Sequence, residues 1–172
     1  MTFISHLKCS TKFEEIQATR FEEVFDVDLH KIEQGIGVTG DYKITRSHSC
    51  ENRWYEKIRN SPIVEFKHDK ASTKTNNLYL EFAQTLDGFF TTHSSGCDLA
   101  IKNGNLLVIT TGTQCLVFDE PHYQKLLEYV TRDVQTKNWS NGNPAGSFTK
   151  GHLVSVRNAE ICCLLKYDML IG

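Results

Sequence analysis

Apolar and polar residues follow two different periods along this chain. Over residues 11–34, apolar side chains recur at steps of three to five with glutamates between them, which predicts an amphipathic helix. The segment Gly35 to Gly40 ends that predicted helix. Short runs of strand-like composition follow at residues 41–46, 63–67 and 78–82, and they predict three strands.

The second half of the chain mixes both patterns. Residues 91–101 predict a short helix with a serine cap. Residues 106–110, after an Asn-Gly-Asn turn, and residues 114–118 predict strands. A helix is predicted over residues 122–134, a loop over 135–150, and late strands at 154–156 and 161–165. Because strands come together before helices return, the order favours one α/β domain with a mixed sheet.

Composition narrows the class of protein without deciding it. The chain has 172 residues, 40% hydrophobic and 23% charged, as in an ordinary globular domain. A net charge of -2 excludes a strongly basic nucleic-acid binder but allows a local basic rim around an acidic site. Six cysteines without a Cys-x-x-Cys pair, no signal peptide and no long apolar run predict free, mostly buried thiols, a cytoplasmic protein and no membrane span.

The candidate chemistry lies around Glu65 and Lys67. Strand residues alternate between faces, so these two side chains project to the same side. Asp41 begins the strand-like run before them. Mg²⁺ prefers one or two carboxylates plus waters and substrate phosphate, so Asp41 and Glu65 are predicted ligands and the Phe66 carbonyl could add an oxygen. Lys67 would orient the attacking water or stabilise transition-state charge. The alternative is an exposed Glu-Lys pair, with Asp41 as an ordinary turn residue.

A longer stretch, residues 64–82, resembles a phage and bacterial branch of the PD-(D/E)XK, or restriction-endonuclease-like, nuclease superfamily. The parts that look alike are Glu65-Phe66-Lys67, Asp69, Thr75-Asn76-Asn77, Glu81, Asp87-Gly88 and Thr91-Thr92. The resemblance covers roughly residues 41 to 100. The chain departs from the branch at Asn76, where Gly is usual, and at Asp87, where Ser is usual.

The resemblance implies a fold and an activity. The fold is a restriction-endonuclease-like αβββαβ core, with a central mixed sheet flanked by helices. The activity is a Mg²⁺- or Mn²⁺-dependent nuclease that hydrolyses phosphodiester bonds, with DNA favoured over RNA. A phage, viral or bacterial setting in the host cytoplasm and a homodimer also fit, since many relatives are dimers.

Further site residues follow from the same resemblance. Glu81 would be an additional metal-site acid on a strand beside that of Glu65, the alternative being a solvated strand-end charge. A glutamate of the first helix, Glu23 or its neighbour Glu22, would reach the metal, the alternative being a solvated helix face. Basic and polar residues after Asp69 would line the substrate approach and touch phosphates, unless they form a solvated loop; they are Lys70, Lys74, Thr75, Asn76 and Asn77.

Other readings stay open or are excluded. A structure-selective junction resolvase, an RNA endonuclease, an exonuclease and a noncatalytic binding module on the same scaffold all remain alternatives. The run from Gly35 to Gly40 matches Gly-x-Gly-x-x-Gly, but a helix before it and a strand after it exclude a dinucleotide site. His48 and Cys50 have no second pair of zinc ligands near them, which argues against a zinc site.

Overall fold

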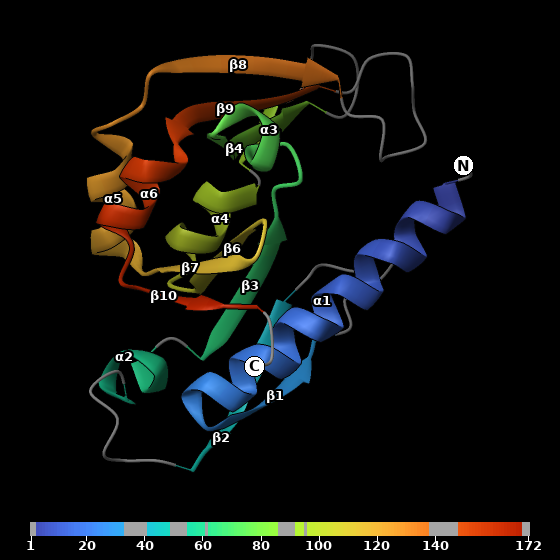
Figure 1. Cartoon of the computed structure of the whole chain (residues 1–172), viewed down its shortest axis with the longest axis vertical. Helices are drawn as coiled ribbons and strands as arrows, with labels where there is room; N and C mark the ends of the chain where they lie inside the picture. Colours follow the sequence, from blue (N-terminus) through green and yellow to red (C-terminus); the bar gives the residue numbers. More distant parts are fainter. Residues whose placement is uncertain are drawn as a thin grey trace.

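A computed structural model describes residues 3–32, 41–48, 55–60, 62–85, 92–94, 96–137 and 148–169. Within these ranges the protein is mixed α/β, with helices on both sides of a mixed sheet (Figure 1). The elements in chain order are α1 (Phe3–Phe25), β1 (Val27–Lys31), β2 (Asp41–Ser47), α2 (Tyr55–Asn60), β3 (Ile63–His68), α3 (Ser72–Thr75), β4 (Asn77–Thr85), β5 (Thr92–Ser94), α4 (Gly96–Lys102), β6 (Leu106–Thr111), β7 (Gln114–Phe118), α5 (Glu120–Leu127), β8 (Arg132–Lys137), β9 (Phe148–Ser155), α6 (Val156–Cys162) and β10 (Leu165–Asp168).

The strands form two sheets. The main sheet has the order β1-β2-β3-β6-β7-β10, and β3 and β6 are its parallel neighbours while the other described pairs are antiparallel. The second sheet has the order β5-β4-β9-β8 and is antiparallel. Between β3 and β6 the chain therefore leaves the main sheet, contributes β4 and β5 to the second sheet, and returns through α4.

Two apolar cores hold the layers together. On one face of the main sheet, Phe21 and Phe25 of α1 pack with Tyr42, Phe66 and other buried residues of the strands. On the other face, apolar side chains of β6 and β7 pack with those of α4, α5, α6 and the second sheet. Because each face of the main sheet has its own core, successive residues of β3 enter different environments.

Helix α1 ends earlier than its sequence pattern predicts. Asp26 adopts a left-handed backbone conformation, with φ 54°, and the chain reverses there into β1, which pairs with β2. The prediction of a helix through residue 34 was therefore wrong for residues 26–32, and residues 33 and 34 lie outside the described ranges. The added strand, β1, makes the run β1-β2-β3 the three-stranded meander of the main sheet.

Other predicted elements need similar corrections. The helix predicted over residues 122–134 ends at Leu127, and part of the predicted loop 135–150 is strand, in β8 and β9. The strand predicted at residues 161–165 is instead the end of α6 and the start of β10. The strand at residues 78–82 exists, within β4, but it lies in the second sheet and not beside β3.

Several predictions fall outside the described residues. These include the Gly35 to Gly40 turn, Cys50, Asp87-Gly88 and Thr91. Of the described cysteines, Cys97, Cys115 and Cys162 are buried free thiols, as predicted, and Cys163 is a half-buried one. No helix in the described part of the chain is long and apolar enough to cross a membrane.

Candidate active site

The predicted trio comes together on one face of the main sheet. Val64 and Phe66 point into the core beneath α1, with exposed fractions of 0% and 2%, so the alternation along β3 sends Glu65 and Lys67 to the opposite face. Asp41 is the direct register partner of Glu65 in the antiparallel β2–β3 pair, and side chains opposed in this way are neighbours on one face. Nζ of Lys67 lies 2.5 Å from Oε1 of Glu65.

These three residues line one cavity, here called the site cavity. Its volume is about 430 Å³. Apolar side chains form part of its wall, and two asparagines from the turn into β6 complete it; the lining residues are Ile32, Asp41, Ile63, Glu65, Lys67, Gly96, Leu99, Ala100, Asn103 and Asn105. An acidic pair and a lysine therefore face one small cavity with a partly apolar wall.

Burial and neighbouring charges together set the charge states of Glu65 and Lys67. Burial raises the pKa of Glu65, Lys67 lowers it, and the charges of Asp41 and Glu81 raise it further. For Lys67, burial acts to lower the pKa, but Glu65, Cys97 and Glu81 together hold that pKa above its usual range. Lys67 is therefore protonated at neutral pH and suits charge stabilisation better than the role of a base.

The acid of α1 whose charge acts on the site residues is Glu14, which sequence reasoning missed. Burial raises its pKa, the charges of Lys31 and Lys67 lower it, and those of Asp41 and Glu65 raise it. A signal was present in the sequence. Glu14 precedes the buried residues Gln17, Ala18 and Phe21 by three, four and seven positions, so it continues the buried stripe of α1.

The predicted helix acid, Glu23, is placed elsewhere. It lies nine residues beyond Glu14, roughly 13 Å along the helix axis. Its side chain is 43% exposed and pairs with Arg20 at 3.0 Å. Neighbouring Glu22 accepts a hydrogen bond from the backbone N–H of Leu29, at 2.7 Å, and so supports the turn into β1.

Glu81 reaches the site from the second sheet. Its charge acts on both Glu65 and Lys67, although β4 and β3 are in different sheets. Gly96, with φ +60°, begins α4 directly against it, and a Cβ atom there would lie 2.6 Å from Cβ of Glu81. Only glycine fits this left-handed, crowded position without displacement. Glu81 is thus held near Glu65 by the close approach of α4 to β4.

The strand that carries Lys67 is fixed from behind by α1. Nε2 of Gln17, which is fully buried, donates to the carbonyl of Lys67 at 3.1 Å and to Oγ1 of Thr110 at 2.6 Å. Phe66 lies between the two site residues with its side chain in the core. Its carbonyl as a metal ligand stays a prediction.

The predicted substrate loop is mostly built on its own hydrogen bonds. Oγ1 of Thr75 contacts the backbone of Ala71 and Asn77, and Nδ2 of Asn77 donates to the carbonyl of Thr75. Lys70 and Lys74 are exposed. Asn76, where the resembling branch has Gly, adopts φ 55° and ψ 21°, a left-handed conformation that Asn tolerates better than most residues. Asparagine at this position is therefore compatible with the turn.

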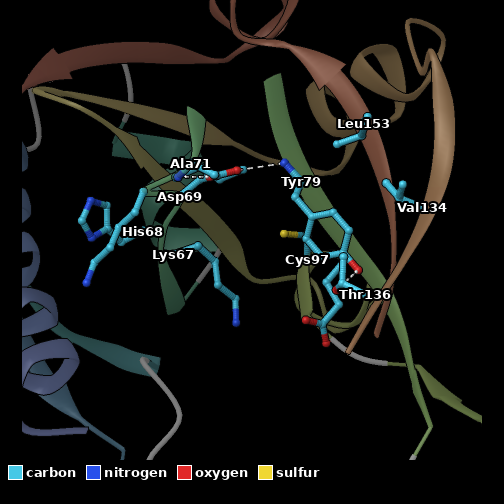
Figure 2. Close-up of a pocket in the computed structure, with 12 residues that line it drawn as sticks. Lys67, His68, Asp69, Ala71, Tyr79, Cys97, Val134, Thr136 and Leu153 are labelled. Atoms are coloured by element: carbon cyan, nitrogen blue, oxygen red, sulfur yellow. Dashed lines mark hydrogen bonds between the residues drawn. The ribbon is translucent and has the colours of Figure 1, made fainter. Parts of the chain in front are cut away.

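Asp69 has a structural role in this loop. Its Oδ1 accepts from the backbone N–H groups of Ala71 and Ser72, both at 3.0 Å, and its Oδ2 accepts from that of Tyr79 at 2.8 Å. One carboxylate thus ties the end of β3 to the start of β4 (Figure 2).

The donor chemistry of the site cavity fits Mg²⁺ or Mn²⁺. Asp41 and Glu65 supply the one or two carboxylates that Mg²⁺ takes from proteins, which leave further positions to water and phosphate. Burial is the main cause of the raised pKa values of Glu65 and Glu14, and the charges of neighbouring acids add to it. A bound cation would favour the ionised form of these carboxylates. Among the described residues, no three His, Cys, Asp or Glu side chains form a complete metal centre.

Comparisons of the chain with protein-family models, curated proteins and solved structures give no match. The candidate function therefore depends on the geometry and electrostatics of the site.

Proposed function

We propose that this chain is a divalent-metal-dependent nuclease that hydrolyses phosphodiester bonds, with DNA as the favoured substrate. One observation supports this most directly. Asp41 and Glu65 oppose each other on neighbouring strands, and Lys67 lies on the same face beside Glu65. In this arrangement two carboxylates and a protonated lysine converge on one cavity, as metal-assisted phosphoryl chemistry requires.

The chain order supports a restriction-endonuclease-like core as part of the proposal. The elements α1, β1, β2, β3, α4 and β6 follow the order αβββαβ, and β6 lies parallel to β3. Helices α2 and α3, the second sheet and the C-terminal elements are additions to that core. In this interpretation Asp41 opens the second strand and Glu65-Phe66-Lys67 occupy the third.

Each site residue has a defined part. Asp41 and Glu65 would hold Mg²⁺ or Mn²⁺, and Glu14 and Glu81 would add negative charge around it. The bound ion lowers the pKa of a water and polarises the scissile phosphate. Protonated Lys67 faces the same cavity and stabilises the extra negative charge that the phosphate gains during attack.

Asn105 is a further candidate for phosphate or sugar contact. Its residue is 8% exposed and it lines the site cavity. Its side-chain amide carries both a donor and an acceptor, which suit the oxygens and hydroxyls of a phosphate or sugar in the cavity.

Cleavage assays test the proposal. Labelled single-stranded DNA, duplex DNA and RNA are incubated with Mg²⁺, Mn²⁺ or EDTA and with wild type, Lys67→Ala or Lys166→Ala. Lys166 is an exposed lysine of β10 and serves as the matched control. Metal-dependent cleavage by wild type and Lys166→Ala, lost in Lys67→Ala, is expected. Absence of cleavage under every condition, with intact binding, would instead favour a noncatalytic binding module.

A further inference from the structure

A second cavity, here called the side cavity, opens beside the site cavity. Its volume is about 590 Å³. Lys67 lines both cavities, so whatever enters the side cavity lies next to the residue proposed to face the scissile phosphate. Figure 2 shows Lys67, Tyr79, Cys97 and Thr136 around this space, with Leu153 and Val134 on the strands of the second sheet.

The chemistry of the side cavity suits a flat, partly apolar group. Val134, Leu153 and Ile109 supply apolar surface, and Thr136 supplies a hydroxyl. Glu81 also lines the cavity, and its carboxylate disfavours a phosphate inside it. A nucleobase or sugar therefore fits this space better than the phosphate backbone of a nucleic acid.

Tyr79 forms a fixed aromatic wall of the side cavity. A Cβ atom on Gly151 would lie 2.4 Å from Cε2 of Tyr79, so the ring rests directly on this glycine. Its hydroxyl is 2.8 Å from Oγ1 of Thr149, and its backbone N–H donates to Asp69. A ring held at both ends loses little conformational freedom when a base stacks on it.

Positive charge at the rim of the side cavity favours the binding of a nucleic-acid strand. Lys70 is exposed and lines the side cavity three residues beyond Lys67. His68 lines it as well, and its ring stacks on Phe13 of α1 with centroids 3.9 Å apart. Lys70 can contact a phosphate outside the cavity while the base lies within it.

We propose that the side cavity binds one unpaired nucleotide next to the scissile phosphate, with Tyr79 as its stacking platform. This inference rests on the proposed nuclease function and narrows its substrate to strands with an unpaired base at the cleavage position. A cavity of this volume is within the range of roughly 300–1,000 Å³ that accepts small ligands. A base that is paired within a duplex is stacked between its neighbours and must leave the helix to enter.

Binding measurements with a fluorescent 12-nucleotide DNA strand and its blunt duplex test this inference. Ca²⁺ replaces Mg²⁺ so that the strand stays intact, and 2-aminopurine in the strand reports stacking. Val134→Trp fills the side cavity, whereas Gln135→Trp is the matched control, because Gln135 is exposed and adjacent on the same strand but does not line the cavity. We expect Val134→Trp to weaken single-strand binding at least 10-fold and Gln135→Trp to change it less than 2-fold.

Substitutions of Tyr79 give a second, independent readout. Since stacking of a base on an aromatic ring is worth about 5- to 150-fold in affinity, Tyr79→Leu should weaken single-strand binding by that factor and abolish the change in 2-aminopurine fluorescence. Tyr79→Phe keeps the ring and should stay within about 3-fold. If circular dichroism shows that Val134→Trp does not fold, the comparison of Tyr79→Leu with Tyr79→Phe tests the inference by itself.

The outcomes separate this inference from the proposed nuclease function. Equal binding of duplex and single strand, with no difference between Tyr79→Leu and Tyr79→Phe, overturns the side-cavity inference even when cleavage is observed. Single-strand binding that depends on Tyr79, without cleavage in Mg²⁺ or Mn²⁺, supports the cavity and overturns the nuclease.

Discussion

Replacing Lys67 with methionine separates the chemical role of this residue from its effect on folding. The substitution keeps a long side chain but removes the cation beside Glu65, whose carboxylate is 2.5 Å away. If Lys67 stabilises charge in the transition state, Lys67→Met should lower the cleavage rate by about 10²- to 10³-fold, the usual effect of losing one such group.

The magnitude of the folding effect follows from exposure. The Glu65 side chain is 12% exposed and that of Lys67 is 41% exposed. Breaking a fully buried pair costs about 3–5 kcal/mol, whereas an exposed pair contributes about 0–1 kcal/mol. Because water reaches the lysine, we expect Lys67→Met to lower the metal-free unfolding free energy by about 1–2 kcal/mol.

A double-mutant cycle tests this reasoning. Glu65→Gln removes the buried charge, so adding Lys67→Met to it should cost less than about 0.5 kcal/mol. Urea denaturation at pH 7 in EDTA measures all four proteins, and cleavage assays run beside it. The reasoning is refuted if Lys67→Met is equally destabilising with and without Glu65→Gln, or if it cleaves at the wild-type rate.

Four further outcomes are expected. Mg²⁺ or Mn²⁺ at a hundred times Kd should stabilise the protein by about 2.7 kcal/mol, and thermal melts against EDTA should show no such gain in Glu65→Gln. Since burial raises the folded pKa of Glu65 and Glu14 above the reference value of 4.5, their contribution to stability is full below that pH. That contribution is lost as the pH rises through the folded pKa. The unfolding free energy of metal-free wild type, measured in urea, should therefore decrease with pH more than that of a Glu14→Gln, Glu65→Gln variant. The same pH dependence in both proteins would contradict this. Asp69→Ala leaves three backbone N–H groups without their acceptor and should lower the unfolding free energy by about 3 kcal/mol, and a loss below about 1 kcal/mol in urea melts would argue against this role. Asn76→Gly should be neutral within about 0.5 kcal/mol while Asn76→Ala costs about 1 kcal/mol, and equal stability of the two would show that the left-handed turn is unimportant.

The faces of the site strands were predictable because strand alternation is a local property. The period of two placed Glu65 and Lys67 on one side, and the structure places Asp41 opposite Glu65. The sheet that receives a strand is not a local property. Residues 78–82 were predicted to lie beside Glu65, yet β4 pairs with β5 and β9 in the second sheet, and β9 follows it by more than sixty residues.

The helix errors have local causes of another kind. Residues 27–31 continue the amphipathic pattern of α1, and the reversal depends on the left-handed Asp26, which no apolar period reveals. The apolar run at 161–165 is typical of a buried strand. Ser155 nevertheless caps a helix there, accepting from the backbone N–H of Asn158 at 3.1 Å, and Ile161 is 64% exposed. A serine at this position is a recognisable helix start signal in the sequence. The strand prediction gave more weight to the apolar run that follows it.

In the proposed function, the main sheet carries the residues for phosphodiester cleavage and the second sheet carries residues that bind the nucleotide. Asp41, Glu65 and Lys67 belong to the main sheet, whereas the second sheet supplies Tyr79, Glu81, Val134, Thr136 and Leu153 to the side-cavity wall. Asp69 ties the start of β4 to the end of β3, and Gly96 brings α4 against Glu81. Both ends of the segment between β3 and β6 are therefore fixed near the site. Substitutions of the side-cavity residues Tyr79 and Val134 in the second sheet should therefore change KM with little change in kcat, and substitutions of Glu65 and Lys67 on β3 should do the reverse. A variant of Tyr79 that lowered kcat as far as Lys67→Met does would mean that the two walls act as one unit.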